Sequence, residues 1–476
     1  MSKPKKSKAN PLIIYLFISM TILTVVTIGL IKFIDILPNR YFGLLIGVFA
    51  IIEFVFSCLL FSKKLFIKVL GGLTTTFYIF VLIIAIIYEI NTIDFLKKIG
   101  KSEYITLNYK LISLKSSDIN NLSDVTNKKL GIVEDTKEEV TTHLYKKSIK
   151  KYETYDHYSI LIDKLENKNL DVILLEDSML SILKDENPKI GETTKVIYEF
   201  SVDLKQKTKK HTKNVTKKPF NIYISGIDTY GKINSVSRTD VNMILTVNPK
   251  TFDILVTSIP RDYYVELYGY NEFDKLTHSG IYSIDTSIGT IEKMLGIKID
   301  YYVKVNFTSL IKMVDTLGGI DVESEYEFVS QDGYKFYKGT NKMNGAKALS
   351  FSRERKSLPD GDRSRNVNQQ AVLTAIINKL MVKSNLTKYN DLLKSLKPSI
   401  VTNMSDSQIT NFVKMQIDKN PKWNIEYYLL DGEDGYEYTY SYSKNKLYVM
   451  IPDEKSLRSS SDKINEILLK EDKKAS

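Results

Sequence analysis

Residues 221–262 read NIYISGIDTYGKINSVSRTDVNMILTVNPKTFDILVTSIPRD. This stretch contains three apolar runs, at 221–228, 242–248 and 252–260, each bounded by polar or turn-forming residues. Their length and their content of Ile, Val and Leu are typical of buried strands. Asp228 follows the first run, and Arg238 precedes the second, so charged side chains lie where strands end. The stretch predicts the centre of a sheet with polar groups at one edge.

The chain beyond this stretch continues to alternate between helix and strand patterns. Helices are predicted over Ile281–Leu295, Leu310–Leu317 and Asn366–Met381, and a strand over 301–307. The tail from Ser405 to Leu469 predicts a helix, a strand, a turn, a strand and a helix. We therefore expect one α/β domain over residues 219–476.

The N-terminal region has the composition of a membrane anchor. Leu12–Ile31, Tyr41–Ser62 and Val69–Tyr88 are runs without charge except for Glu53. About 20 apolar residues cross a hydrocarbon core as a helix. We expect three transmembrane helices over residues 11–90 rather than a cleaved signal peptide. Glu53 is interpreted as a buried polar contact between helices, with a functional site as the alternative.

The distribution of lysine sets the expected orientation. Residues 1–10, a predicted cytoplasmic tail, carry four Lys and no acid, and Lys63, Lys64 and Lys68 lie between the second and third runs. Positive residues next to membrane spans favour the cytoplasmic side. We expect a multi-pass membrane protein with a cytoplasmic N-terminus and extracellular C-terminal domains.

The net charge of +11 does not indicate a nucleic-acid-binding face. Residues 1–10 carry four Lys and residues 205–218 carry seven, without an acid in either, so the rest of the chain is formally neutral. A DNA-binding regulator would need a basic patch on a folded domain. The single cysteine, Cys58, excludes a disulfide framework and a cysteine-based zinc cluster.

The region between the anchor and the main domain predicts a second, smaller domain. Residues 101–204 alternate short apolar runs with amphipathic stretches, as a small α/β accessory domain would, without a catalytic spacing. Residues 205–218 read as a basic solvated linker, which could also contact anionic surfaces.

Arginine is concentrated in the C-terminal domain. The chain has eight Arg, and six of them lie at positions 238, 261, 353, 355, 363 and 365. A guanidinium group holds two phosphate oxygens in a fixed plane and remains charged at physiological pH. Several Arg together would neutralise a diphosphate. The alternative is surface salt bridges, each worth about 0–1 kcal/mol.

Acidic residues accompany these arginines. Asp228, Asp240 and Asp362 are hard oxygen ligands suited to Mg²⁺ or Mn²⁺, which commonly bridge phosphates. A covalent nucleophile with its base is not evident, because the chain has one Cys, no GxSxG and an isolated His278. The remaining interpretation is phosphoryl transfer by positioning and charge neutralisation, with an Asp or the metal assisting deprotonation of the acceptor hydroxyl.

Four segments resemble one known family in order and spacing. They are SRTDVNMILTVNPKTFDILVTSIPRDYYVEL, DKLTHSGIYSIDTSIGTIEKMLGIKIDYYVKVNF, LGGIDV and FSRERKSLPDGDRSRNVNQQ, within residues 221–386. They resemble the LytR-CpsA-Psr family, and the three spans with an accessory domain resemble its capsule-type members. The resemblance implies an α-β-α catalytic domain with a mixed sheet and a hydrophobic slot for a polyprenyl chain.

The resemblance also implies an activity and residue roles. The activity is a Mg-dependent phosphotransferase that moves an anionic glycopolymer, capsular or teichoic-acid-like, from undecaprenyl diphosphate to peptidoglycan. The matching positions are Asp228, Asp240 and Asp362 for the metal; Asp240, Arg353 and Arg355 for catalysis; and Arg238, Arg261, Lys275, Arg365 and Gln369 for the diphosphate and head group. The family often has Arg where this chain has Asn368.

Two other functions remain open at this point. One is a polyprenyl-diphosphate pyrophosphatase, in which water replaces the sugar hydroxyl. The other is a membrane-tethered polymer-binding or regulatory protein whose arginines hold anions without turnover.

Overall fold

The computed structural model describes residues 11–35, 37–98, 104–205, 213–229, 233, 236–382 and 400–471. The chain forms two compact units. The first comprises Met1–Ile99, Met381–Lys394 and Ser405–Pro421; the second comprises Gly100–Leu380, Ser395–Met404 and Lys422–Ser476.

The first unit contains three helices long and apolar enough to cross a membrane, within the residues that the structure describes. They are α1 (Pro11–Ile34), α2 (Asn39–Leu60) and α3 (Leu65–Lys98), as the sequence predicts. The hydroxyl of Thr21 on α1 donates to the Glu53 carboxylate on α2 at 3.5 Å. This interhelical contact supports the interpretation of Glu53 as a buried polar group.

Helix α15 (Asp406–Lys419) belongs to the same unit and contacts the segment between α1 and α2. Arg40 pairs with Asp418 at 3.0 Å, and Lys414 pairs with Asp35 at 2.8 Å. The segment between the first two spans therefore lies on the same side of the anchor as α15.

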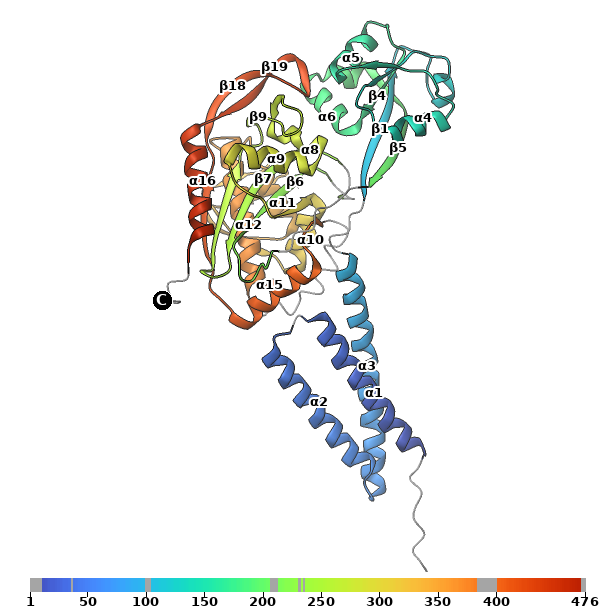
Figure 1. Cartoon of the computed structure of the whole chain (residues 1–476), viewed down its shortest axis with the longest axis vertical. Coiled ribbons are helices and arrows are strands. Elements are labelled where there is room, and N and C mark those ends of the chain that lie inside the picture. Colours follow the sequence, from blue (N-terminus) through green and yellow to red (C-terminus); the bar gives the residue numbers. More distant parts are fainter. Residues whose placement is uncertain are drawn as a thin grey trace, which may run out of the picture. The chain divides into compact units, whose positions relative to one another are not determined.

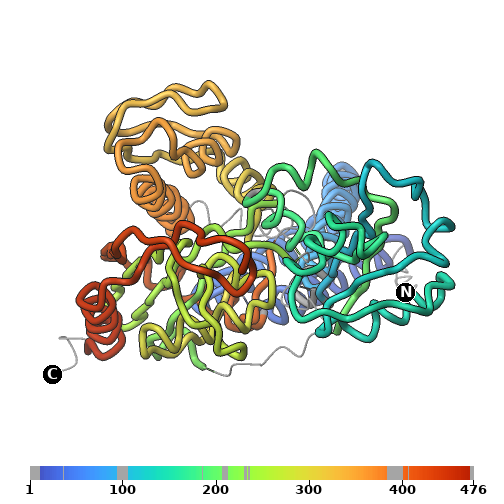
Figure 2. The backbone as a smooth tube through the Cα atoms, turned by 90° about the horizontal axis from the view of Figure 1, so that it is seen from above, coloured from blue at the N-terminus to red at the C-terminus, as the bar shows by residue number. Residues whose placement is uncertain are grey.

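The accessory domain in the second unit is built on a five-stranded sheet. The strand order is β3-β2-β4-β1-β5, with β1 (Tyr104–Leu114), β2 (Leu130–Val133), β3 (Glu153–Tyr155), β4 (Val172–Glu176) and β5 (Thr194–Lys205). Its helices are η1 (Leu122–Val125), α4 (Glu138–Lys146), α5 (Tyr158–Glu166), α6 (Asp177–Glu186) and α7 (Lys189–Thr193). Figures 1 and 2 show this domain as a separate lobe beside the larger domain.

The larger domain is built on a six-stranded mixed sheet of order β16-β11-β6-β7-β8-β17. The strands are β6 (Phe220–Ile227), β7 (Thr239–Asn248), β8 (Asp253–Ile259), β11 (Tyr301–Asn306), β16 (Ile400–Thr402) and β17 (Asn424–Leu429). The central three are antiparallel, whereas β11 runs parallel to β6 and β17 parallel to β8. The three runs of the opening stretch thus form the middle of the sheet.

Helices cover both faces of this sheet, which confirms the expected α-β-α arrangement (Figure 1). On one face, α9 (Ile284–Leu295) and α16 (Glu454–Leu469) pack Ile291 and Ile464 against Tyr223 and Ile244. The opposite face meets α10 (Phe307–Thr316), α11 (Gly345–Arg353) and α12 (Asp362–Met381). Successive strand residues point to opposite faces, so Ile224 and Met243 turn away from that core.

Short elements connect these layers. They are β9 (Tyr264–Glu266), β10 (Phe273–Lys275), α8 (Leu276–Tyr282), β12 (Ile320–Ser324), β13 (Phe328–Val329), β14 (Lys335–Phe336), β15 (Gly339–Met343), β18 (Gly432–Thr439) and β19 (Tyr442–Pro452). Strands β18 and β19 form a long antiparallel hairpin. Of the basic segment 205–218, residues 206–212 lie outside the described residues; near its end, Lys213 pairs with Asp300 at 2.8 Å and Val215 is buried.

Two local features were not predicted from the sequence. Helix α11 ends at Arg353 within the FSRER segment, so Arg353 is its last residue and Arg355 follows it. Helix α12 begins at Asp362, four residues before the periodic pattern starts, because Asp362, Arg363 and Arg365 are polar residues of its first turns. Apolar periodicity locates the buried face of a helix but not its polar start.

Candidate active site

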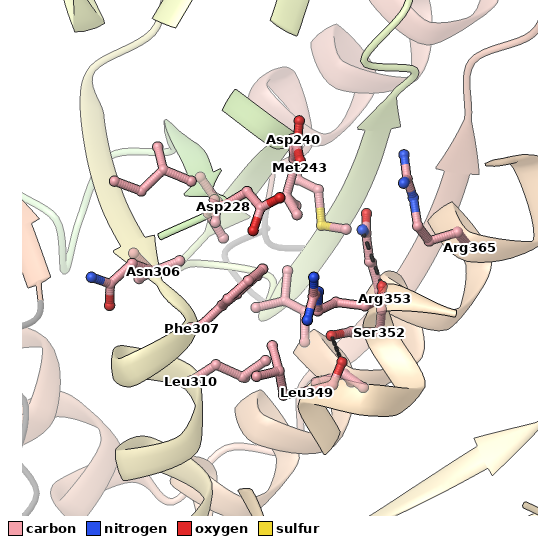
Figure 3. A pocket seen from close by; sticks show the side chains of 18 of the residues that line it. Asp228, Asp240, Met243, Asn306, Phe307, Leu310, Leu349, Ser352, Arg353 and Arg365 are labelled. Carbon is pink, nitrogen blue, oxygen red and sulfur yellow. Dashed lines mark hydrogen bonds between the residues drawn. The ribbon is translucent and has the colours of Figure 1, made fainter. Parts of the chain in front are cut away.

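A pocket of about 420 Å³ lies between the sheet and helices α10, α11 and α12 (Figure 3). Its inner walls are apolar. They are formed by Ile224, Ile227, Val241, Met243, Val303, Val305, Phe307, Leu310, Met313, Leu349, Val372, Leu373 and Ile376. An apolar cavity of this size fits part of a hydrocarbon chain.

Charged residues line the same pocket. They are Asp228, Asp240, Arg261, Arg353, Arg355, Lys356 and Arg365, and Gln369 lies among them. Most of the residues expected from sequence to form a site are therefore brought together. The pocket combines an apolar part with a group of cations and carboxylates.

The topology of the sheet explains why these residues meet. Asp228 directly follows β6, Asp240 is the second residue of β7, and Arg261 follows β8 by two residues. Because β6 and β7 are antiparallel, the end of one and the start of the next lie at the same edge. A Cβ atom at Gly226 would lie 2.7 Å from the Cβ of Val241, so the close approach of the strands here requires glycine.

Arg261 is held between carboxylates. Its guanidinium donates to Asp240 at 3.0 Å, lies 3.5 Å from Asp262, and lies 4.0 Å from Asp362. Thr277 also donates to Asp240, at 3.1 Å. These contacts fix the positions of Arg261 and Asp240 before any ligand binds.

The charge of Asp240 is stabilised by this arrangement. Burial on its own would raise the pKa of Asp240, but the positive charges of Arg261, Arg238 and Arg365 outweigh it and lower the pKa. Asp240 is therefore an anion at neutral pH. With one oxygen accepting from both Arg261 and Thr277, it is better suited to holding a cation than to accepting a proton.

Asp228 has the opposite electrostatic character. Burial and the nearby charge of Asp240 raise its pKa, while Arg353, Arg238 and Arg261 only partly compensate. Figure 3 shows Asp228 and Asp240 on the same side of the pocket, with the Asp228 carboxylate turned toward the interior, where Arg353 also lies. A pocket carboxylate with a raised pKa has the properties of a proton acceptor.

Arg365 and Gln369 are buried on the first turns of α12. One terminal nitrogen of Arg365 lies 2.5 Å from an oxygen of Asp362, whereas its Nε has no hydrogen bond, and the same holds for the side-chain oxygen of Gln369. Gln369 donates its amide to the carbonyl of Ser352 at 3.3 Å. Buried donors without a partner are costly unless a ligand satisfies them.

Arg353 and Arg355 lie on the other side of the pocket. The guanidinium of Arg353 lies 4.4 Å from the centre of the Phe307 ring, a cation–π contact that Figure 3 shows beside Leu310 and Leu349. Within the described parts of the chain, no ion pair to a carboxylate involves either arginine. Their charges face the pocket.

Three of the expected site residues are not among the residues that line the pocket. Asp362 contacts Arg365 and Arg261 behind the lining. Lys275 lies 3.6 Å from Asp262 and 3.8 Å from Glu186. Arg238 precedes β7 and acts on the pocket through its charge, because it lowers the pKa of Asp240.

The carboxylates of the site determine how a magnesium ion could bind. Among the described residues, no group of three or more His, Cys, Asp or Glu side chains is placed to hold a metal. Asp228 and Asp240 share the pocket, whereas Asp362 is occupied by Arg365. These two carboxylates could bind one Mg²⁺, which would take its other ligands from phosphate and water. An all-protein metal site does not fit.

The apolar walls and several polar neighbours were not identified individually from the sequence. Val303 and Val305 alternate along β11 with Lys304, so a period of two marks the pocket face of that strand. Phe307 and Leu310 lie on α10, where nothing in the sequence distinguishes a pocket wall from a core position. Phe307 and Leu310 line the pocket because α10 packs over the sheet.

His278, isolated in the sequence, is buried and contacts Asp274 at 2.6 Å. Asp274 also accepts from the backbone and side chain of Ser441. The pair joins α8 to the β18–β19 hairpin and has a structural role.

The pocket of this α/β domain combines arginines with an apolar chamber. These are the features of a protein that binds a phosphate group attached to a hydrocarbon chain. The model of the LytR_cpsA_psr family matches residues 190–466. The chain therefore belongs to the LytR_cpsA_psr family.

Relatives of known name are similar to the same part of the chain. The polyisoprenyl-teichoic acid–peptidoglycan teichoic acid transferase TagU of Bacillus subtilis strain 168 is 37% identical over 246 residues, which are 51% of this chain and 78% of the relative. The protein of the same name from Bacillus licheniformis is 39% identical over 188 residues, 39% of this chain and 60% of the relative. The chain thus covers about four fifths of the first relative and less than two thirds of the second.

Solved structures are also similar. The crystal structure of B. subtilis TagU is 34% identical, with a TM-score of 0.42, over 54% of this chain and 99% of that one. A structure described as TagT bound to LI-WTA is 28% identical, with a TM-score of 0.45, over 55% and 95%.

Proposed function

We propose that this protein is a membrane-anchored phosphotransferase that attaches an anionic glycopolymer, carried on a polyprenyl diphosphate, to peptidoglycan. The observation that carries the proposal is the pocket. It joins a chamber with apolar walls to four arginines, Arg261, Arg353, Arg355 and Arg365. A polyprenyl diphosphate has this same division into hydrocarbon and doubly charged anion. The names of the similar transferases agree with this assignment.

In the proposed reaction, a hydroxyl of peptidoglycan attacks the phosphorus that bears the glycopolymer. A P–O bond forms to the hydroxyl oxygen, and the bond from that phosphorus to the bridging oxygen of the diphosphate breaks. Polyprenyl monophosphate leaves with the bonding electron pair. The product is a phosphodiester between peptidoglycan and polymer.

The residues of the pocket have separate tasks in this reaction. Arg261 and Arg365, fixed by Asp240 and Asp362, hold the diphosphate in one orientation. Arg353 and Arg355 neutralise the charge that grows on the leaving phosphate.

The hydroxyl proton needs an acceptor, and the structure favours Asp228 over Asp240. The pKa of Asp228 is raised by burial and by Asp240, whereas the pKa of Asp240 is lowered by its arginines. A Mg²⁺ bound by these two carboxylates would neutralise phosphate charge, and because it would lower the pKa of Asp228, it would then assist deprotonation by acidifying the hydroxyl itself.

We further propose that the domains after α3 are extracellular. The lysine-rich N-terminus supports a cytoplasmic start. The ion pairs of Arg40 and Asp35 with α15 also support it. They join the connection between α1 and α2, which is extracellular if the N-terminus is cytoplasmic, to a helix that follows the catalytic residues in the chain. Protease treatment of intact cells should digest the C-terminal domain; protection of that domain would overturn the orientation.

A test in living cells uses a host strain in which the gene has been deleted. The wild-type protein should restore wall-bound glycopolymer, and variants Asp240→Ala and Arg353→Ala should not, at equal protein level. Full attachment by both variants would favour a tethered polymer-binding protein without turnover.

A further inference from the structure

The β18–β19 hairpin carries tyrosines that the fold does not bury. Tyr436 and Tyr438 on β18 are 65% and 54% exposed. Tyr448 on β19 lies opposite Tyr436, with ring centres 6.0 Å apart and planes at 76°. The ammonium group of Lys446 lies 5.8 Å from the centre of the Tyr438 ring. We call Tyr436, Tyr438 and Tyr448 the tyrosine strip.

Hairpin packing does not explain the strip. The run EYTYSYS at 437–443 continues with Tyr440 and Tyr442, which do have packing roles. Tyr442 is 2% exposed, and Tyr440 lies 5.6 Å from Tyr270 and 5.9 Å from Tyr282, measured between ring centres. Tyr436 and Tyr438 instead present large aromatic surfaces to solvent. Such exposed aromatic groups are typical of binding surfaces.

The hairpin that carries the strip is joined, at its open end, to segments that bear pocket residues. The backbone N–H of Met450 on β19 donates to the carbonyl of Asp262 at 2.7 Å. Arg363, on the first turn of α12, pairs with Asp431 at 3.0 Å and donates to the carbonyl of Gly432 at 2.7 Å. The hairpin is thus joined to the loop of Arg261 and to the helix of Arg365.

The electrostatics agree with this position. Burial and the hydrogen-bonded Asp434 raise the pKa of Tyr448, and the carboxylates of Asp262 and Asp362 raise it further. Tyr448 therefore lies within electrostatic range of the acids that hold Arg261 and Arg365. A long polymer bound along the strip would extend toward the segments that carry Arg261 and Arg365.

The charge of the hairpin selects among possible occupants. Asp434 lies two residues from Tyr436 on the same face of β18, and Lys446 lies over the Tyr438 ring, so the face of the strip has no net charge. Glu433 and Glu437 alternate to the other face of β18, and Glu437 pairs with Lys446 at 3.2 Å. A face without net positive charge does not attract an anionic polymer. It fits a neutral sugar chain, because the apolar C–H face of a pyranose stacks on an aromatic ring while its hydroxyl and amide groups donate to a carboxylate.

We infer that the tyrosine strip binds the glycan strand of the acceptor peptidoglycan and presents its hydroxyl to the pocket. The identity of the acceptor rests on the proposed function. The physical basis is the exposed aromatic surface, the connection of its hairpin to Asp262 and Arg363, and the absence of net positive charge on its face.

The test measures sedimentation of the full-length protein, in detergent, with purified peptidoglycan sacculi stripped of wall polymer. The double variant Tyr436→Ala/Tyr438→Ala should weaken binding about tenfold, since two stacking contacts are lost. Tyr436→Phe/Tyr438→Phe should stay within about threefold of wild type, because the rings remain. Tyr427→Ala, on β17 and 47% exposed, is the matched control and should bind as wild type.

Transfer kinetics separate this inference from the proposed function. The alanine pair should raise the KM for peptidoglycan and leave the KM for lipid-linked polymer unchanged. A raised KM for the lipid-linked polymer instead would assign the strip to the donor and overturn the inference. Unchanged sedimentation would also overturn it. If wild type binds sacculi through the strip yet transfers nothing, the inference stands and the proposed transferase fails.

Discussion

Two buried carboxylates, Asp240 in the larger domain and Glu176 in the accessory domain, have pKa values shifted in opposite directions. In the larger domain, three arginines lower the pKa of Asp240 despite its burial. In the accessory domain, Glu176 at the end of β4 is also removed from water, and burial raises its pKa to about 7, with Asp135 adding to the rise. Ser178 donates to Glu176 at 2.8 Å but does not compensate.

The difference follows from where arginine occurs in the sequence. None lies between Arg40 and Arg238, so the accessory domain has no guanidinium to pair with Glu176. The larger domain has six between Arg238 and Arg365. Asp240, in contact with Arg261, is a fixed anion that can position cations, whereas Glu176, without a guanidinium nearby, exchanges a proton near neutral pH. We therefore place the phosphate chemistry in the larger domain alone.

The largest effect is expected for Arg353→Ala. This arginine faces the pocket over Phe307, and its removal should reduce transfer about 100-fold or more, as loss of a charge-stabilising donor does. The thermal unfolding midpoint should not change. Arg458→Ala, at an exposed ion pair on α16, is the control and should transfer at the wild-type rate. Equal activity of both variants would remove Arg353 from the site.

Arg261→Ala should reduce both activity and stability. The substitution leaves Asp240 and Asp262 without their common partner, and breaking a largely buried pair costs about 3 kcal/mol. Thermal unfolding of the full-length protein in detergent measures the loss. Adding Asp240→Asn should restore part of the stability but none of the activity. A variant as stable as wild type would show that Arg261 is not part of the scaffold.

Magnesium should stabilise the protein in a pH-dependent manner. Because the pKa of Asp228 is raised, the carboxyl group is protonated more readily as the pH falls, and a protonated carboxyl does not bind a cation. The increase in unfolding midpoint caused by Mg²⁺ should therefore be larger at pH 8 than at pH 5. Asp228→Asn should abolish it. The same increase in the variant would place the ion elsewhere.

The smallest effect concerns Glu176 in the accessory domain. Its raised pKa means that its contribution to stability is present below its unfolded pKa and is lost as the pH rises through about 7. Glu176→Gln should thus leave the unfolding midpoint unchanged at pH 5 and raise stability at pH 8, by roughly 1–2 kcal/mol after allowance for partial exposure. Glu192→Gln, at an exposed position, is the control. A stabilisation that is the same at both pH values would show that the pKa of Glu176 is not raised by burial.

Much of the fold could be predicted from the sequence because its patterns are local. The three strands of residues 221–260 and the three apolar helices have uniform hydrophobic runs. In the accessory domain, β2 and β4 are short apolar runs that are buried along nearly their whole length, so a sequence pattern marks them. No such run marks β5, because it alternates buried and exposed residues and lies at the edge of its sheet. In β1 the apolar residues are interrupted by Thr106, Asn108 and Lys110.

The residues of the site could be predicted from the sequence, but the role of each residue could not. Charge type and motif order indicated Asp228, Asp240 and the arginines. They could not show that Asp362 faces Arg365 rather than the pocket, or that Asp240 is occupied by Arg261 and Thr277. These facts depend on the side-chain geometry where β7, β8 and α12 meet, which no local pattern encodes.

Transfer of a glycopolymer phosphate to peptidoglycan by the arginine pocket can be measured with purified components. The reaction combines full-length protein, polyprenyl-diphosphate-linked glycan labelled in the sugar, Mg²⁺ and peptidoglycan, and prenyl monophosphate and wall-bound label are measured together. We expect that monophosphate appears only when peptidoglycan is present and that one glycan becomes attached for each monophosphate released. Release at the same rate without peptidoglycan, with no label on the wall, would contradict it and identify a hydrolase.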